Sequence, residues 1–119
     1  MDTTRTAVAY LRRTDEREAR RLEEFEALRG RARRMGAALQ EEFGARVRVY
    51  LFGSLLDSDR FRGGSDIDLG VEGLGAAEYW DAWRMVEPLA EGASVDLVRL
   101  ETAAASLQRL IRTEGEVLA

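Results

Sequence analysis

Hydrophobic residues recur along the first third of the chain with the period of an α-helix. Between Asp15 and Phe43 they stand three or four positions apart, so that they would form one apolar stripe along a helix. Seven residues make up this stripe: Leu22, Phe25, Leu28, Ala32, Met35, Leu39 and Phe43. Asp15 followed by Glu18 is typical of a helix start, and Gly44 is typical of a helix end. The pattern predicts one long helix here and a short separate helix at residues 5–13.

Beyond Gly44 the pattern changes to that of short strands and helices. Segments rich in β-branched, aromatic or alternating apolar residues predict three strands, at residues 47–52, 66–71 and 94–98. Two helices are predicted at residues 76–90, with Pro88 near the end, and 102–112, and a short edge strand at 116–118. The chain has no internal repeat or linker. We therefore expect a single α/β (α+β) domain, a small mixed sheet with helices packed on it, in which residues 1–44 form a helical segment packed on or extending from a core at 45–119.

The composition restricts the chemistry that this chain can perform. Its 18 basic residues are all arginines, and it has no lysine, histidine or cysteine. These absences exclude a thiol nucleophile, an imidazole base, a usual zinc site, Schiff-base chemistry and a Walker-type phosphate loop. Catalysis would have to use carboxylates, hydroxyls, arginines, backbone amides or a hard cation such as magnesium.

The net charge of −4 is unevenly distributed. Residues 1–50 carry 12 Arg against 9 Asp and Glu, giving +3, and residues 51–119 carry 6 against 13, giving −7. The acidic half argues against direct nucleic-acid binding. In residues 12–34 arginines alternate with acidic residues, which favours a solvated, self-paired helix face over an RNA-binding one; docking of a partner or of a second copy of the chain stays open. No apolar run reaches the length of a membrane span and no signal peptide is evident, so we expect a cytoplasmic protein.

Two aspartates lie inside the second predicted strand, where aspartate is uncommon. Asp66 and Asp68 alternate with aliphatic residues, so that both carboxylates point to one face, roughly 6–7 Å apart at the backbone. Asp96 stands between Val95 and Leu97 in the third predicted strand. If the two strands are neighbours, three carboxylates gather on one patch, and their repulsion favours a magnesium ion of the kind that supports phosphoryl or nucleotidyl transfer. The alternative is that Asp66 and Asp68 are solvent-facing residues of a half-exposed strand.

A glycine and a serine follow the first predicted strand. Gly53 would let a ligand approach the main chain, and Ser54 would offer a hydroxyl and an amide to a phosphate. The alternative for Ser54 is a plain helix N-cap. Trp80 and Trp83, three residues apart on a predicted helix, are expected in the core rather than stacked on a nucleotide base.

In combination, three segments resemble one known fold family. They are Phe52-Gly53-Ser54, Ser65-Asp66-Ile67-Asp68-Leu69 and Val95-Asp96-Leu97-Val98. They are similar to the motifs of the polymerase β nucleotidyltransferase superfamily, and within it to minimal nucleotidyltransferases (MNT), which are usually paired with HEPN-domain ribonuclease toxins. The resemblance covers residues 45–119 and implies a polymerase β-type fold after a long N-terminal helix.

The resemblance also implies roles for five residues. Gly53 and Ser54 would hold the terminal phosphates of ATP. Asp66 and Asp68 would bind magnesium, or manganese in its place. Asp96 would complete the site, by binding the catalytic metal or by accepting the proton of the attacking hydroxyl.

Family members of this type are antitoxins that transfer AMP from ATP to a tyrosine of the partner toxin, and the resemblance implies this activity here. The chain departs from the family in the loop after Ser54, which is one residue longer than usual and lacks an early arginine unless Arg60 or Arg62 replaces it. Two alternatives stay open: an antitoxin with a weakened site that acts by binding the toxin, and nucleotidyl transfer to a small molecule.

Overall fold

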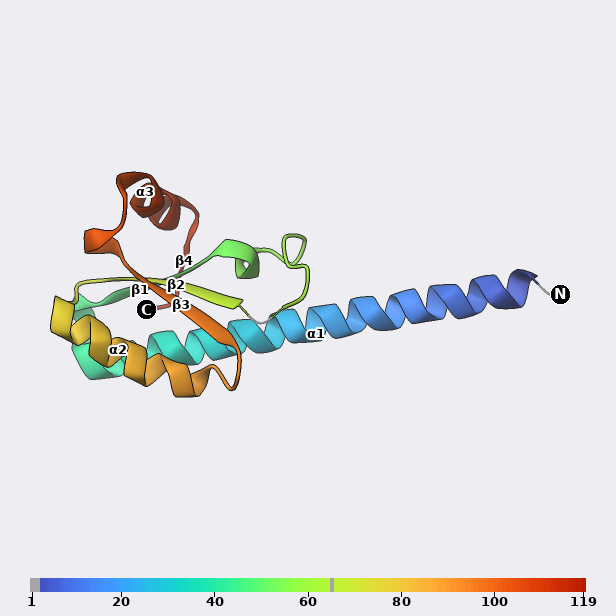
Figure 1. Cartoon of the computed structure of the whole chain (residues 1–119), viewed down its shortest axis with the longest axis horizontal. Helices are drawn as coiled ribbons and strands as arrows, with labels where there is room; N and C mark the ends of the chain where they lie inside the picture. The colour runs from blue at the N-terminus through green and yellow to red at the C-terminus, as the bar shows by residue number, and fades with distance from the viewer. Residues whose placement is uncertain (1–2, 65) are drawn as a thin grey trace.

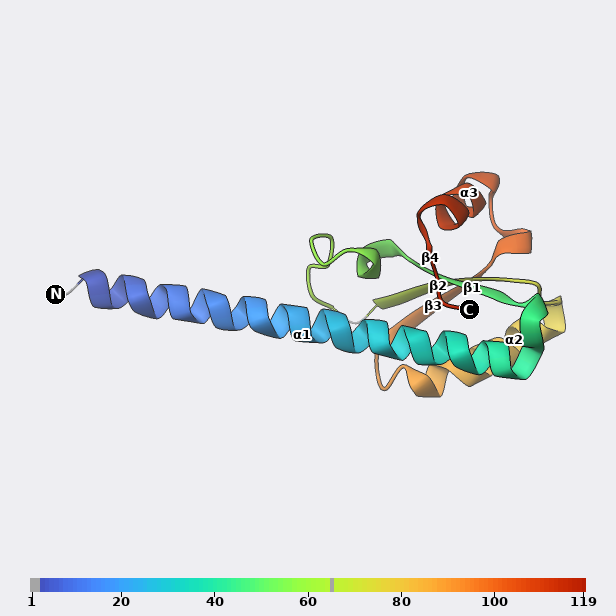
Figure 2. The same cartoon turned by 180° about the vertical axis from the view of Figure 1, so that it is seen from behind.

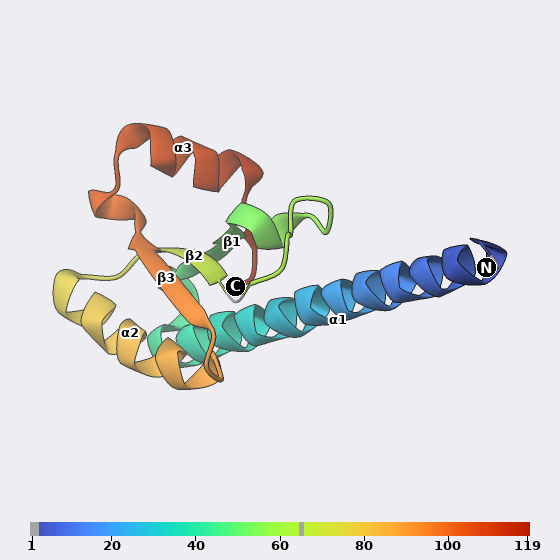
Figure 3. The same ribbon diagram turned by 45° about the vertical axis from the view of Figure 1, so that its right-hand side comes forward.

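Four strands form one mixed sheet with helices on both of its faces. The computed structural model describes residues 3–64 and 66–119. Its helices are α1 (Thr3–Phe43), α2 (Ala76–Leu89) and α3 (Ala105–Glu114), and its strands are β1 (Arg48–Phe52), β2 (Asp66–Glu72), β3 (Ser94–Arg99) and β4 (Glu116–Val117). The strand order is β3-β2-β1-β4; β1 is antiparallel to β2 and β4, and β2 is parallel to β3. The expected small mixed sheet is confirmed, with α1 and α2 on one face and α3 on the other (Figure 1 and Figure 3).

The main core lies between the sheet and the layer formed by α1 and α2. Three alternate residues of β2 are fully buried on this face: Ile67, Leu69 and Val71. Five residues of the predicted apolar stripe complete it from α1: Phe25, Leu28, Ala32, Met35 and Leu39. On the opposite face α3 lies close to the sheet, because a Cβ at Gly70 would meet side-chain atoms of Ile111 and Leu100 at 2.9 Å. The strand period therefore gives β2 one apolar face and one face on which α3 lies over Gly70 and bonds Glu72 through Arg112.

α1 is a single helix, so the expected helix start at Asp15 and the separate helix at residues 5–13 are wrong. It has 41 residues and begins at Thr3, which places Asp15 on an exposed turn in its interior. No glycine or proline precedes Gly30, so nothing in the first 29 residues interrupts the helix. The helix end is confirmed: Gly44 follows with a φ of +80°, a conformation that glycine adopts without strain.

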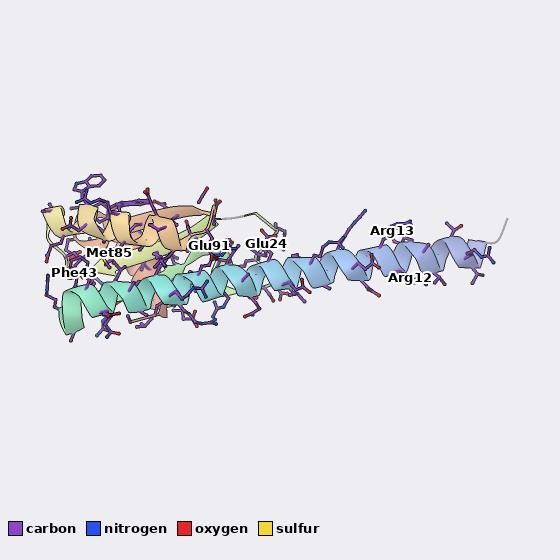
Figure 4. All side chains as sticks on the ribbon, turned by 90° about the horizontal axis from the view of Figure 1, so that it is seen from below. Arg12, Arg13, Glu24, Phe43, Met85 and Glu91 are labelled. Carbon is purple, nitrogen blue, oxygen red and sulfur yellow. The ribbon has the colours of Figure 1, made fainter. Side chains whose placement is uncertain are left out.

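The N-terminal half of α1 projects beyond the rest of the molecule, as both sides of the cartoon show (Figure 1 and Figure 2). Arg12 and Arg13 lie on this projecting part, well away from the sheet and from α2, whereas Glu24 lies where α1 reaches the body (Figure 4). The projecting part also exposes apolar side chains, among them Tyr10 and Leu11. Within the described ranges no helix combines the length and the apolar character that crossing a bilayer requires.

α3 is displaced toward the C-terminus relative to the prediction. It begins at Ala105 rather than at Thr102, because residues Leu100–Thr102 form a short 3₁₀ turn that buries Leu100. The predicted edge strand is confirmed as β4, which pairs with the middle of β1.

The two tryptophans of α2 have different environments. Trp83 is partly buried against the main core, as expected, but Trp80 is 60% exposed, so its predicted core position is wrong. Tyr79 occupies the inward position beside it; its ring lies 5.3 Å from that of Trp80, and its hydroxyl donates to the Leu97 carbonyl. Tyr79 and Trp83, four positions apart, share the inward side of α2. Trp80 is turned away from that side and faces solvent.

The start of α2 depends on the carboxylate of Glu78. This group accepts hydrogen bonds from the Arg46 guanidinium and, at 2.9 Å, from the Gly75 N–H. Arg46 first, and Gly75 second, lower the pKa of Glu78 to about 2. The ionised side chain therefore links the first turn of α2 to the segment that precedes β1.

We expect Glu78→Gln to destabilise the fold at neutral pH and to have little effect near pH 2. A carboxyl whose pKa falls from 4.5 to about 2 on folding stabilises the folded state when ionised. That contribution is complete above the unfolded pKa and is lost as the pH falls through the folded pKa. Thermal unfolding across this pH range, followed by circular dichroism, measures the difference. Glu41→Gln, an exposed change on α1, should unfold like the wild type, and an unaltered pH profile for Glu78→Gln would contradict the role of this carboxylate.

Candidate active site

Three aspartates come together on the α3 face of the sheet, beyond the part that α3 covers. β2 and β3 pair in a register that places Asp68 directly beside Asp96, and Asp66 beside Ser94 on the same face. On the other side of β2, Asp68 is in register with Phe52, the last residue of β1. Because β2 and β3 are neighbours, the carboxylates of Asp66, Asp68 and Asp96 share one patch, which we call the aspartate patch.

The residues that the structure describes do not neutralise the aspartate patch. Asp68 is half-buried, and burial raises the pKa of its carboxyl, with further increases from the negative charges of Asp96 and then Asp66. Across residues 3–64 and 66–119, all ion pairs involve other carboxylates, and the three aspartates accept no hydrogen bond. Unpaired and mutually repelling carboxylates on a half-exposed patch attract a cation.

The aspartate patch has the oxygen donors of a magnesium site that waters and phosphate oxygens complete. In the part of the chain that the structure describes, no three acidic side chains are arranged to hold one ion by themselves. Magnesium does not require three, because it commonly takes one or two carboxylates and completes its coordination with waters and phosphate oxygens. Asp68 and Asp96, adjacent and unpaired, can supply that number, and Asp66 follows on the same strand face.

Gly53 lies against Asp68 at the end of β1. Its φ is +81°, and a Cβ at this position would lie 2.4 Å from Asp68 Oδ2. A side chain is therefore disfavoured twice, by the left-handed backbone and by the contact with the carboxylate. The sequence analysis expected a ligand to approach the main chain at Gly53. In the structure the Asp68 carboxylate occupies the space where the Gly53 side chain would lie, so Gly53 brings the end of β1 into contact with the aspartate patch.

Ser54 follows in a short 3₁₀ turn, Gly53–Leu56, which we call the Ser54 turn. The N-cap of this turn is Phe52, so the interpretation of Ser54 as an N-cap is wrong. Ser54 is half-buried, and its hydroxyl makes no hydrogen bond within the described ranges. Its hydroxyl is thus available next to Gly53, which lies against Asp68 of the aspartate patch. Ser65, which belongs to the second sequence motif, lies outside the described residues.

Two arginines of α1, which the sequence reasoning missed, hold the Ser54 turn and the loop after it. Arg29 Nη1 donates to the Leu55 carbonyl at 2.7 Å. Arg21 Nη1 donates to the Phe61 carbonyl at 2.8 Å and also to the Ser58 carbonyl. The two arginines stand eight positions apart, close to two helical turns, so they share one side of α1. That spacing is the one signal in the sequence that could have linked them.

The loop arginines do not reach Ser54 in this structure. Arg62 donates to the Asp59 carbonyl, so its guanidinium is engaged inside the loop. Arg60 bonds with its N–H to the Asp57 carbonyl, and its side chain is exposed. Arginine charge near the Ser54 turn comes instead from α1.

The aspartate patch is open to the surface. Cavities of about 500, 480 and 360 Å³ lie elsewhere in the structure, and neither Ser54 nor any of the three aspartates lines them. Asp66 and Asp96 are exposed and Asp68 is half-buried, so the carboxylates of the aspartate patch are accessible from the surface.

Comparisons with known proteins agree with this geometry. A protein-family model described as Polymerase beta, Nucleotidyltransferase matches residues 39–119. A comparison with curated proteins gave no match.

Among solved structures, several toxin–antitoxin complexes contain a similar chain. One, a toxin–antitoxin with AMP-PNP, is 26% identical with a TM-score of 0.57, and the alignment covers 73% of this chain and 72% of that chain. A second, a tri-AMPylated Shewanella oneidensis HEPN toxin in complex with MNT antitoxin, is 28% identical with a TM-score of 0.50, covering 70% and 65%. A third, an MntA–HepT variant with glutamate in place of two aspartates that are separated by one residue, is 25% identical with a TM-score of 0.54, covering 70% and 68%. The chain thus spans 65% to 72% of the length of these relatives.

Proposed function

The chain belongs to the polymerase β nucleotidyltransferase family, and we propose that it transfers AMP from ATP to a tyrosine hydroxyl of a partner HEPN ribonuclease toxin, as the antitoxin of that pair. The observation that carries the proposal is the placement of Asp68 and Asp96 side by side at the Ser54 turn. The relatives support the choice of nucleotide and partner, because one holds AMP-PNP and another contains an AMPylated HEPN toxin.

The chemistry assigns a task to each residue. The tyrosine oxygen attacks the α-phosphorus of ATP, the bond from this phosphorus to the bridging oxygen of the β-phosphate breaks, and pyrophosphate leaves. Ser54 holds the terminal phosphates with its hydroxyl and amide. Asp96, exposed next to Asp68, accepts the tyrosine proton directly or through water, or serves as a metal ligand. Magnesium bound by Asp68 and Asp96, with Asp66 on the same face, would neutralise the phosphate charge.

A second candidate function is neutralisation of the toxin by binding alone. It is favoured by the position of Arg62, whose guanidinium bonds the Asp59 carbonyl, and by the lack of a described bond between Ser54 and any arginine of residues 55–64. In that case phosphate binding would be weak although the contact with the toxin would be normal.

We expect the chain to label its partner toxin when the two are incubated with magnesium and ATP labelled at the α-phosphate. ATP labelled at the γ-phosphate is the matched control and should give no label, because AMP transfer releases that phosphate with pyrophosphate. Removal of magnesium with EDTA should stop the reaction. Mass spectrometry should locate the AMP on a tyrosine. An unlabelled toxin that is nevertheless inhibited would favour the second candidate, and label from the γ-phosphate would overturn AMP transfer.

A further inference from the structure

We infer that Arg29 and Arg21 of α1 are positioning residues of the nucleotide site, which hold the main chain of residues 53–61 in the shape that presents Ser54 to the phosphates of ATP. The inference rests on the proposed function, because it takes Ser54 as the phosphate-binding residue. It assigns to α1 a role in the reaction beyond its contribution to the core.

Arg29 is fixed by contacts on three sides. Its side chain is 13% exposed, and Nη1 donates to the Leu55 carbonyl at 2.7 Å. Nη2 donates to both carboxylate oxygens of Glu116, at 3.0 and 2.8 Å, and the guanidinium lies 5.6 Å from the centre of the Phe25 ring. A charged, partly buried guanidinium whose two terminal nitrogens are engaged by different partners has little rotational freedom, so the Leu55 carbonyl is held at a defined position. Leu55 is the residue directly after Ser54.

Arg21 fixes the other end of the segment. Glu18 bonds its Nε at 2.9 Å and its Nη2 at 2.6 Å, which leaves Nη1 for the Phe61 and Ser58 carbonyls. The Phe61 ring is buried and lies 5.7 Å from the Phe25 ring. The two arginines therefore bond the backbone close to the two residues that anchor this segment in the core, Leu55 and Phe61.

These bonds matter because the segment lies outside the sheet ladder. Buried side chains at Leu55 and Phe61 determine where the segment lies, but they do not determine how its peptide planes are turned. The hydrogen bonds from Arg29 and Arg21 to its carbonyls do. A phosphate-binding hydroxyl and amide that are already oriented lose less conformational entropy on binding than mobile ones.

Arg31 offers a matched control on the same helix. It too donates to a backbone carbonyl, Ala90 O at 3.0 Å, and pairs with a glutamate, Glu91 at 2.9 Å, and its side chain is 24% exposed. These contacts join α1 to the end of α2, where Glu91 lies beside α1 (Figure 4). Loss of the Arg31 contacts should therefore cost stability like loss of the Arg29 contacts, but without an effect on the Ser54 turn.

We expect Arg29→Gln to weaken the binding of ATP in the presence of magnesium chloride about tenfold and to raise KM for ATP by the same factor, with kcat little changed. Arg21→Gln should act in the same direction. Arg31→Gln should lower Tm about as much as Arg29→Gln but leave KM at the wild-type value. Arg29→Lys, which keeps one charged donor, should restore part of the affinity. Isothermal titration calorimetry, and the KM for ATP in the toxin-labelling reaction, give these values.

Hydrogen exchange of the Ser54 turn tests the inference without nucleotide. The amides of residues 54–56 should exchange faster in Arg29→Gln than in the wild type or in Arg31→Gln. If Arg29→Gln binds ATP like the wild type and its turn exchanges at the wild-type rate, the inference is wrong although the proposed function stands. If the wild type binds no ATP, the proposed function fails, and the positioning role in a nucleotide site fails with it, whatever the exchange rates are. Should Arg29→Gln not fold, Glu116→Gln, which removes the second partner of Arg29, and Arg29→Lys take its place.

Discussion

Asp68→Asn is expected to reduce kcat/KM for AMP transfer at least about 100-fold, the upper end of what the loss of an outer-shell partner of a metal ligand costs. Asp68 is the central carboxylate of the aspartate patch, with Asp96 beside it on β3 and Gly53 against its Oδ2. Asparagine preserves the shape of the side chain but removes the negative charge that a magnesium–triphosphate complex requires. Steady-state labelling of the toxin from α-labelled ATP measures the loss.

The same substitution is expected to stabilise the protein in the absence of metal and nucleotide. Burial first, and the charges of Asp96 and Asp66 next, raise the pKa of Asp68, so the folded state binds this proton more tightly than the unfolded state does. The contribution of Asp68 to stability consequently falls as the pH rises from the unfolded pKa through the raised folded one. Below this pH range Asp68→Asn should have the same free energy of unfolding as the wild type. Above it the variant should be more stable, by no more than about 1 kcal/mol because solvent screens a half-exposed group.

Asp81→Asn is the control for both results. Asp81 is exposed on α2 and pairs with Arg84, away from the aspartate patch. This variant should label the toxin at the wild-type rate and show no pH-dependent gain in stability. Full labelling by Asp68→Asn would remove Asp68 from the site, whereas a loss of labelling without any gain in Tm at neutral pH would show that repulsion within the patch is weak.

Gly53→Ala is expected to lower the transfer rate about 100-fold, the cost that a misplacement of about 1 Å can have. The added Cβ would lie 2.4 Å from Asp68 Oδ2 and 3.3 Å from Asp68 Cγ, so the carboxylate must turn away from its place beside Asp96. A second effect is local: alanine at a φ of +81° destabilises the fold by about 1 to 2 kcal/mol. Thermal unfolding and toxin labelling separate the loss of stability from the loss of activity.

Gly44 allows the two effects of Gly53→Ala to be distinguished. Its φ of +80° is nearly the same as that of Gly53, but among the described residues no heavy atom beyond its two chain neighbours lies within 4 Å of a Cβ placed there. Gly44→Ala should therefore lose only the stability that alanine at a positive φ costs, about 1 to 2 kcal/mol. Its transfer activity should equal that of the wild type. Equal activity losses in the two variants would mean that backbone strain, and not the contact with Asp68, accounts for the effect at Gly53.

The strands could be predicted from their β-branched, aromatic and alternating residues, and the positions of Asp66 and Asp68 could be predicted from the period of two. Asp66 and Asp68 interrupt an aliphatic pattern at alternate positions, which places them on the face opposite Ile67 and Leu69 wherever the strand lies. The pairing of Asp68 with Asp96 could not be predicted in the same way. It depends on the register of two strands that are joined through α2, and no local pattern specifies that register.

The errors concern features with weak or competing local signals. An acidic pair such as Asp15 and Glu18 occurs both at helix starts and on exposed helix faces. The only sequence signal that separates the two cases is whether a helix-breaking glycine or proline precedes the pair, and here none does. Trp80 is one position away from the inward side of α2, a difference that falls within the uncertainty of a helical period. The bonds from Arg29 and Arg21 to backbone carbonyls join residues that lie 26 to 40 positions apart, so no local pattern predicts these bonds, and the sequence shows only that the two arginines share one side of α1.

α3 covers only part of its face of the sheet, and this has a consequence for the choice of acceptor. A reaction centre that faces bulk water cannot by itself prevent water from competing with the acceptor for the α-phosphorus. The molecule that binds at the aspartate patch therefore has to exclude the water. A folded protein that presents its tyrosine on a broad complementary surface can dock over the aspartate patch and dry it in the same step, whereas a small hydroxyl compound would leave the patch wet. We therefore expect the acceptor protein to cover the aspartate patch as well as to supply the tyrosine. The reaction should then proceed only on a partner whose surface is complementary to this part of the chain.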